Sequence, residues 1–232
     1  MKGAFAIEGM TIRVVVCPDS FKGSLTSVEA ADAIVRGIRI GAGENNFRIT
    51  SIPLADGGEG TVDAMVRATG GLIRRVKVHD PLGRKIESFY GLLGDGKTAV
   101  VEMAAASGLT LLSESERNPL ITSTYGTGEL LNAAANEGVE EIIVGIGGSA
   151  TNDAGCGAMR ALGVRFLDKN GNELPDGGGF LMDLESVDLS GFAFPTDKVR
   201  VVVACDVTNP LYGPMGAAAV FGPQKGASPD SV

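Results

Sequence analysis

Acidic, hydroxyl and amide side chains gather among glycines in one segment of this 232-residue chain, Gly145–Gly155. The segment follows the apolar run Ile142–Val144 and precedes a helical pattern of small residues that ends at Leu162. This order predicts a strand, a glycine-rich turn and a helix. Glycines let the backbone approach a ligand closely, and free N–H groups at a helix start favour an anion. The residues expected to bind a phosphate or a carboxylate are Gly147, Gly148, Ser149, Thr151 and Asn152.

Asp153 places a carboxylate beside this predicted anion site, as a phosphate-bound Mg²⁺ would require. The alternative is an ordinary turn in which Asp153 stabilises the start of the helix. Gly145, Gly147 and Ala150 also match a weak dinucleotide fingerprint, and an acid, Asp168, lies about 20 residues further on. A nicotinamide-dependent oxidoreductase is therefore an alternative function, although Asp168 is equally well explained as a turn residue.

A polar loop, Pro18–Ser24, follows the first predicted strand. Ligands of open α/β sheets bind at the carboxyl ends of the strands, so this loop is a second candidate site. Lys22 could neutralise a phosphate or a substrate carboxylate, and Asp19 could accept a hydroxyl proton. Ser20 and Ser24 are further candidate ligands, and the alternative is a solvated loop that happens to carry charge.

The segment Ala55–Thr61 repeats this composition after the second predicted strand. Asp56 and Glu59 lie among Gly57 and Gly58 at the start of a predicted helix. The two carboxylates could bind a metal ion or hold polar groups of a substrate. The alternative is helix capping, for which Asp and Glu are also suited.

The last predicted strand, Val199–Ala204, ends at Cys205 and Asp206. Asp206 is a candidate general base or Mg²⁺ ligand. The residues Thr208–Pro210 that follow could simply form a turn.

The segment Gly91–Thr98 matches the P-loop pattern letter for letter, but we reject this assignment. A P-loop joins a strand to a helix, so that its N–H groups converge on phosphate. Here the residues after Thr98 are typical of a strand, and Asp95-Gly96 is a hairpin turn signal. We therefore predict a β-hairpin.

Composition excludes several classes of protein. A net charge of −8, the absence of Trp and the lack of a Lys/Arg cluster argue against nucleic-acid binding. Three widely spaced cysteines argue against disulfides and zinc and predict a cytoplasmic location. The single histidine, His79, cannot form a His-pair metal site. Apolar runs are too short to span a membrane.

The order of predicted elements changes along the chain. A buried strand is predicted at Ile12–Cys17 and a second strand at Ile49–Leu54, with a helix between them that begins at the capping box Thr26–Glu29. From Ile73 to Met103 the pattern is that of an antiparallel meander, after which strand–helix order returns.

These patterns predict an α/β protein of two domains. Residues 11–75 would form a Rossmann-like parallel sheet unit. Residues 76–232 would form a second α/β domain that contains the antiparallel meander and the glycine-rich site loop.

Five segments in this order together resemble the motifs of the bacterial glycerate kinase family. They are Pro18–Ser24, Ala55–Thr61, Gly147–Gly155, Cys205–Leu211 and Phe221–Ala227. The resemblance implies two α/β domains with an active site in a cleft between them. It also implies an ATP-dependent, Mg²⁺-using kinase that converts D-glycerate to 2-phosphoglycerate, rather than to 3-phosphoglycerate.

On chemical grounds, the candidate catalytic residues of such an enzyme are Lys22, Asp56 and Asp206, with Asp153 and Asp206 as Mg²⁺ ligands. Asn209 and Lys225 lie in two of the motifs and join the predicted substrate- or phosphate-binding residues. The expected partners are D-glycerate and ATP, and a homo-oligomer is possible.

Members of this family continue beyond the Phe221–Ala227 motif. We therefore expect the remainder of the first domain to lie outside these 232 residues. A catalytically inactive, ligand-binding fragment of the kinase is an alternative to an active enzyme.

Overall fold

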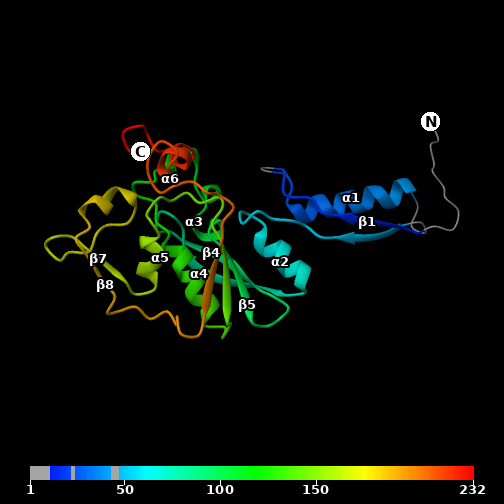
Figure 1. Cartoon of the computed structure of the whole chain (residues 1–232), viewed down its shortest axis with the longest axis horizontal. Helices are drawn as coiled ribbons and strands as arrows, with labels where there is room; N and C mark the ends of the chain where they lie inside the picture. The colour runs from blue at the N-terminus through cyan, green and yellow to red at the C-terminus, as the bar shows by residue number, and fades with distance from the viewer. Residues whose placement is uncertain (1–10, 22–23, 43–46) are drawn as a thin grey trace. The chain divides into compact units, whose positions relative to one another are not determined.

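The structure, a computed structural model, describes residues 11–21, 24–42 and 47–232 (Figure 1). The chain divides into two compact units, Met1–Asp56 and Gly57–Val232. Both units combine helices and strands, so the predicted α/β class is confirmed.

The first unit contains two parallel strands and one helix. Strand β1 (Ile12–Val16) pairs with β2 (Phe47–Ser51), with Ile12 opposite Phe47. Helix α1 (Ser27–Ala42) connects them and packs on both strands.

The predicted capping box starts α1. The Thr26 N–H donates to Glu29 Oε2 over 2.9 Å, and the Glu29 N–H donates to Thr26 Oγ1 over 3.1 Å. These two reciprocal bonds satisfy N–H groups that the first helical turn leaves without partners.

The first strand is less buried than its apolar sequence predicted. Val16 is buried, but Ile12 is exposed and Val15 is 62% exposed. A two-stranded sheet with one helix covers only one face of each strand, which leaves the other apolar side chains uncovered.

The second unit is built on a five-stranded mixed sheet of order β3-β4-β5-β6-β9. Strand β4 (Lys85–Leu92) pairs antiparallel with both β3 (Leu72–His79) and β5 (Thr98–Glu102), which confirms the predicted meander. Strands β6 (Glu141–Gly145) and β9 (Arg200–Ala204) then add in parallel to β5.

Helices cover both faces of this sheet, because neighbouring residues of a strand point to opposite sides. Val100 packs with Val62 of α2 (Thr61–Thr69), whereas Ala99 and Val101 pack with Leu130 of α4 (Tyr125–Ala135). Figure 1 shows α2 and α4 on the two sides of β4 and β5.

This packing sets the boundary between the compact units at Asp56–Gly57, earlier than the expected position near residue 75. Val62 and Val66 of α2 lie in one apolar cluster with Leu93 and Val100 of the meander. Helix α2 therefore belongs with the sheet that follows it in sequence.

Among the described strands, β9 pairs with β6 and lies at the edge of the sheet. Val201 and Val203 are 42% and 53% exposed, so the expectation of a buried final strand is wrong for most of its residues. An edge strand has a neighbour on one side only, and the apolar run in the sequence does not reveal its place in the sheet.

Shorter elements complete the second unit. They are the helices α3 (Ala104–Ser107), α5 (Cys156–Ala161) and α6 (Ala217–Phe221), the 3₁₀ helices η2 (Leu109–Leu111), η3 (Glu114–Glu116), η4 (Gly178–Asp183) and η5 (Pro223–Lys225), and the antiparallel hairpin β7 (Arg165–Leu167) and β8 (Ser186–Asp188). Among the described helices, none is long and apolar enough to cross a membrane.

Candidate functional site

The candidate site of the second unit begins at one edge of its sheet. Glu102, Gly145 and Ala204 are the last residues of the parallel strands β5, β6 and β9, and they lie in one row across the sheet. The segments after Gly145 and Ala204 therefore leave the sheet side by side, at the edge where parallel sheets bind ligands.

The turn before α2 packs directly on the segment after β6. The Gly147 N–H donates to the Gly57 carbonyl over 3.1 Å. A Cβ atom at Gly145 would lie 2.4 Å from the Gly57 oxygen, and one at Gly147 would lie 2.8 Å from Gly58 Cα. These positions tolerate no side chain, so the glycines allow two backbone segments to lie in contact. The structure thus brings together two of the predicted loops.

Backbone hydrogen bonds fix the next residues of the β6 loop. Leu109 N–H donates to the Gly148 carbonyl over 2.9 Å, and Ala150 N–H donates to the Ser107 carbonyl over 2.8 Å. Among the described residues, nothing accepts a hydrogen bond from the N–H of Gly148 or Ser149. Adjacent N–H groups without protein partners are suited to bind an anion.

Lys225 is buried beside this loop. Its Nζ donates to Ser149 Oγ over 2.8 Å and to the Thr151 carbonyl over 2.6 Å. Burial lowers the pKa of the Lys225 ammonium, and the nearby charge of Asp153 opposes this shift. Because both direct partners are neutral oxygens, the ammonium has a positive charge and one further donor to offer a ligand. Lys225 therefore joins Ser149 and Thr151 in space, although they are far apart in sequence.

Asp153 is buried and bonded by four protein donors. They are the Thr124 N–H and hydroxyl, both at 2.8 Å, and the N–H groups of Gly155 and Gly157, both at 3.1 Å. This geometry favours the helix-start role that the sequence left open, because Asp153 occupies N–H groups at the beginnings of α4 and α5. Its role as an Mg²⁺ ligand stays a prediction.

The helix predicted after the glycine-rich turn is α5. Helix α5 begins at Cys156, and its Gly157 N–H is taken by Asp153. Asp153 therefore occupies one N–H group in the first turn of α5, and anion binding by this loop stays a prediction. The N–H groups of Gly148 and Ser149, which bond to no acceptor in the described part of the chain, lie earlier in the loop.

Glu59 lies in the turn before α2 and is held from the segment after α3. Thr110 Oγ1 donates to Glu59 Oε1 over 2.8 Å. Leu109, next to Thr110, binds Gly148. The segment Leu109–Thr110 thus connects the predicted ligand Glu59 to the glycine-rich loop.

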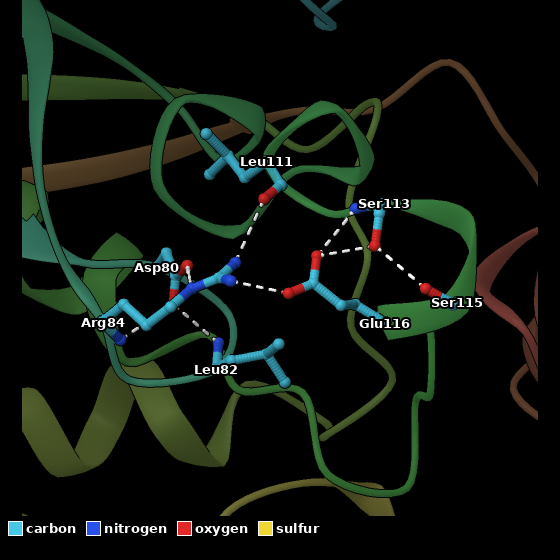
Figure 2. A network of polar contacts seen from close by, with 7 residues as sticks. All are labelled: Asp80, Leu82, Arg84, Leu111, Ser113, Ser115 and Glu116. Atoms are coloured by element: carbon cyan, nitrogen blue, oxygen red, sulfur yellow. Dashed lines mark hydrogen bonds and ion pairs between the residues drawn. The ribbon is translucent and has the colours of Figure 1, made fainter.

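A polar network stabilises residues 111–116, which directly follow Leu109–Thr110 in the chain (Figure 2). Arg84 lies between two carboxylates, with Nε 2.5 Å from Asp80 and Nη1 2.6 Å from Glu116. Its Nη2 also donates to the Leu111 carbonyl over 3.3 Å, and Glu116 accepts from the N–H and hydroxyl of Ser113. The network anchors residues 111–116 to the buried Asp80 and so supports the segment that contacts the site.

Glu102 is a functional candidate that was missed at the sequence level. It is 2% exposed, and its Oε1 accepts the Val62 N–H over 2.6 Å. Burial raises the pKa of this carboxyl to about 7, while hydrogen bonds from Val62 and Gly60 oppose the rise. An acid directly after the apolar run Ala99–Val101 was the available signal, because it marks a strand end at the ligand-binding edge.

Asp206 and Asn209 follow strand β9. Asp206 is exposed two residues after Ala204, whose carbonyl lies 3.3 Å from the Cβ position of Gly57. Asn209 Nδ2 donates to the Met215 carbonyl over 3.0 Å and so closes a local loop. Asp206 is therefore available at the sheet edge, whereas part of Asn209 is engaged within its loop. Asn152 is exposed in the β6 loop.

The remaining predicted residues belong to the first unit. Asp19 accepts the Ser20 N–H through Oδ1 over 2.6 Å, and Ser24 is exposed. Asp56 is the last residue of this unit. Lys22 lies outside the described residues. The roles of these five residues stay predictions.

Two sequence patterns have structural explanations. Gly91 and Leu92 pair with Val100 and Ala99 in antiparallel strands, which confirms that the P-loop match is a hairpin. Asp168 accepts the N–H groups of Asn170 and Asn172, as expected for a turn residue. It follows β7, which forms a two-stranded sheet with β8 apart from β5, β6 and β9, so the acid expected by the dinucleotide fingerprint is not at the edge of these parallel strands.

Comparison with known proteins agrees with the motifs. The model of the glycerate kinase family matches residues 14–232. This chain belongs to the glycerate kinase family. Its membership also removes the support for an oxidoreductase, which depended on the weak fingerprint around Gly145.

Individual relatives are similar along nearly the whole chain. A glycerate kinase of Bacillus subtilis is 54% identical over 95% of this chain, and the glycerate 2-kinase of Escherichia coli is 51% identical over 94% of it. A crystal structure assigned to glycerate kinase 2 of Salmonella typhimurium LT2 matches 95% of the chain with a TM-score of 0.83 and 51% identity. The chain spans 57%, 56% and 59% of the lengths of these three proteins.

Proposed function

We propose that this chain carries the anion-binding part of a glycerate kinase, which transfers the terminal phosphoryl group of ATP to D-glycerate. The observation that supports this most directly is the buried ammonium of Lys225, bonded to Ser149 beside the N–H groups of Gly148 and Ser149. The family gives the reaction, and this arrangement gives a place where a phosphate or the glycerate carboxylate would be neutralised.

Phosphoryl transfer depends mainly on positioning and charge neutralisation. Gly148, Ser149 and Lys225 would hold an anionic group of one substrate, and the glycine contact between Gly57 and Gly147 would keep this surface rigid. Asp206, exposed at the sheet edge, would accept the proton of the attacking hydroxyl, with Asp56 as the second candidate.

Mg²⁺ bound to nucleotide phosphates usually takes one or two protein carboxylates. Among the described residues, no group of three or more His, Cys, Asp or Glu side chains is placed to hold a metal ion by itself. Asp206 fits the one-carboxylate requirement because its side chain is exposed, whereas the oxygens of Asp153 already accept four hydrogen bonds. When bound, Mg²⁺ would neutralise charge that develops on the phosphates.

We propose the 2-hydroxyl of glycerate as the acceptor, in line with the name of the Escherichia coli relative. A 3-phosphoglycerate product is the second candidate. A cytoplasmic location is in keeping with three free cysteines at positions 17, 156 and 205.

The test is ADP release by this chain with Mg-ATP, with and without D-glycerate, followed by identification of the product by ³¹P NMR. Glycerate-dependent ADP release with 2-phosphoglycerate as product is the expected result. Binding of Mg-ATP or D-glycerate without turnover would favour the ligand-binding fragment. Thermal stabilisation by NADH and by neither of these ligands would contradict the kinase proposal.

A further inference from the structure

Glu102 connects two parts of the candidate site, the glycine-rich loop after β6 and the turn before α2. It is the last residue of β5 and lies opposite Gly145 of β6 in the parallel register. The Met103 N–H donates to the Gly145 carbonyl over 2.8 Å, so the backbone after Glu102 is fixed to the start of the glycine-rich loop. The Glu102 carboxyl itself accepts the Val62 N–H at the beginning of α2.

The turn that Glu102 reaches, Gly57–Gly60, leads directly into α2. Gly60 precedes α2 with a φ of 90°, and no side chain of its own caps the helix. The Thr61 hydroxyl donates to the Gly58 carbonyl within the turn, over 2.8 Å. The Glu102 carboxyl accepts hydrogen bonds from the backbone of Val62 and Gly60, and so replaces the missing cap from a different strand.

We propose that Glu102 is a positioning residue that holds the turn Gly57–Gly60 against Gly145–Gly147 and thereby orients Glu59 and the ligand-binding surface. This proposal rests on the proposed function for the identity of the ligand, but not for the role of Glu102 in the turn. The residue is 2% exposed, and the role assigned to it acts through the backbone of the turn.

Ionisation of Glu102 controls how firmly the turn is held. Burial raises the pKa of the carboxyl from its ordinary value of 4.5 to about 7, and the charges of Asp63 on α2 and Glu59 in the turn add to this rise. If the turn opens, the carboxyl regains water and its pKa falls. Proton loss therefore favours the open turn, so raising the pH through this range loosens it.

The experiment measures amide hydrogen exchange at Val62 and Gly60 at about pH 6 and about pH 8, corrected for intrinsic rates. In the wild type we expect protection to fall roughly tenfold between these two values. In Glu102→Gln protection should not depend on pH, because the side chain no longer titrates. The matched control is Glu87→Gln, an exposed glutamate of the neighbouring strand β4 that pairs with Arg75, and it should behave as the wild type.

Two results would overturn the proposal. One is a Val62 amide whose protection in the wild type does not change with pH. The other is a Glu102→Gln variant with the same pH dependence as the wild type. Should that variant not fold, ¹³C NMR titration of the Glu102 carboxyl in the wild type decides: a midpoint near pH 7 that moves together with Val62 exchange supports the proposal, and a midpoint near the ordinary value of 4.5 contradicts it.

Ligand binding separates this proposal from the proposed function. With D-glycerate and Mg-ADP as probes, we expect wild-type affinity to weaken from about pH 6 to about pH 8, and the Glu102→Gln affinity to change by less than about twofold. Pronounced pH dependence of exchange in a protein that binds neither probe would support the role of Glu102 in the turn and contradict the kinase proposal.

Discussion

Two glycine-rich turns of the second unit differ in their match to the P-loop pattern and in their position in the sheet. Gly91–Thr98 matches the P-loop pattern but joins the antiparallel strands β4 and β5. Gly145–Gly155 matches no P-loop, but it leaves β6 at the carboxyl edge of three parallel strands. The difference shows that position at a sheet edge, more than the glycine pattern, makes a turn suitable for binding an anion.

Two lysines, one in the hairpin and one that contacts the Gly145–Gly155 turn, show the same contrast. Lys97 of the hairpin lies at the surface, and its Nζ is 2.7 Å from the Glu140 carboxylate, which neutralises it. Lys225 is buried and bonded to the neutral oxygens of Ser149 and Thr151. Only the second lysine has a charge available for a ligand.

The largest effect is expected from Gly145→Ala. The new Cβ would lie 2.4 Å from the Gly57 oxygen and push the two backbone segments apart. We expect binding of D-glycerate or Mg-ADP to weaken by at least about a hundredfold, measured by calorimetry. The control is Gly96→Ala in the hairpin, where no atom lies within 4 Å of the Cβ position. Its φ of +68° places the strain of the new side chain in the hairpin turn alone, so affinity should be retained. Normal binding by Gly145→Ala would contradict the view that the Gly145–Gly155 turn, rather than the hairpin, binds the anion.

Glu102 and Asp95 are predicted to affect stability in opposite directions as the pH changes. Burial raises the pKa of Glu102 to about 7, so its contribution to stability is full below its ordinary pKa of 4.5 and is lost as the pH rises through 7. Relative to the wild type, Glu102→Gln should gain about 3 kcal/mol in free energy of unfolding between about pH 4 and about pH 8. Urea unfolding at a series of pH values measures this difference.

Asp95 provides the comparison for that experiment. Hydrogen bonds from the Lys97 and Thr98 backbone and the Thr98 hydroxyl lower the pKa of Asp95. Its contribution to stability is therefore present above the ordinary pKa and lost as the pH falls through the lowered one. Asp95→Asn should remove stability mainly at neutral pH, and the same slope for both variants would contradict the assignments.

Asp206→Asn tests whether the loop after β9 belongs to the reacting part of the site. In a form of the protein with glycerate-dependent turnover, loss of a base or metal ligand should lower kcat by roughly a hundredfold or more. The hairpin variant Asp95→Asn should keep its kcat. Near-normal turnover of Asp206→Asn would remove this residue from the site.

Lys225→Met should weaken binding of an anionic ligand by roughly tenfold to a hundredfold, because it removes a buried charge-assisted donor. The matched variant is Lys97→Met, whose charge already has a carboxylate partner at the surface. Its affinity should equal that of the wild type within error. Equal losses in the two variants would mean that Lys225 acts only through the fold, and calorimetric titration with Mg-ADP separates these outcomes.

Much of the fold could be predicted because the deciding interactions are local in sequence. The capping box of Thr26 and Glu29 joins residues of one helical turn, and the hairpin at Asp95 closes between adjacent strands. The glycines at positions 57 and 147 also predicted correctly that the backbone comes into close contact there.

The sequence by itself determined these elements, the α/β order and the motifs of the family. Only the tertiary structure decided that Lys225 donates to Ser149 and that Glu102 caps α2. It also decided that the Asp153 carboxylate accepts hydrogen bonds from Thr124 and Gly157, and that β9 is an edge strand. The physical reason is that burial and hydrogen-bond satisfaction depend on partners brought together by folding, and these partners are distant in sequence.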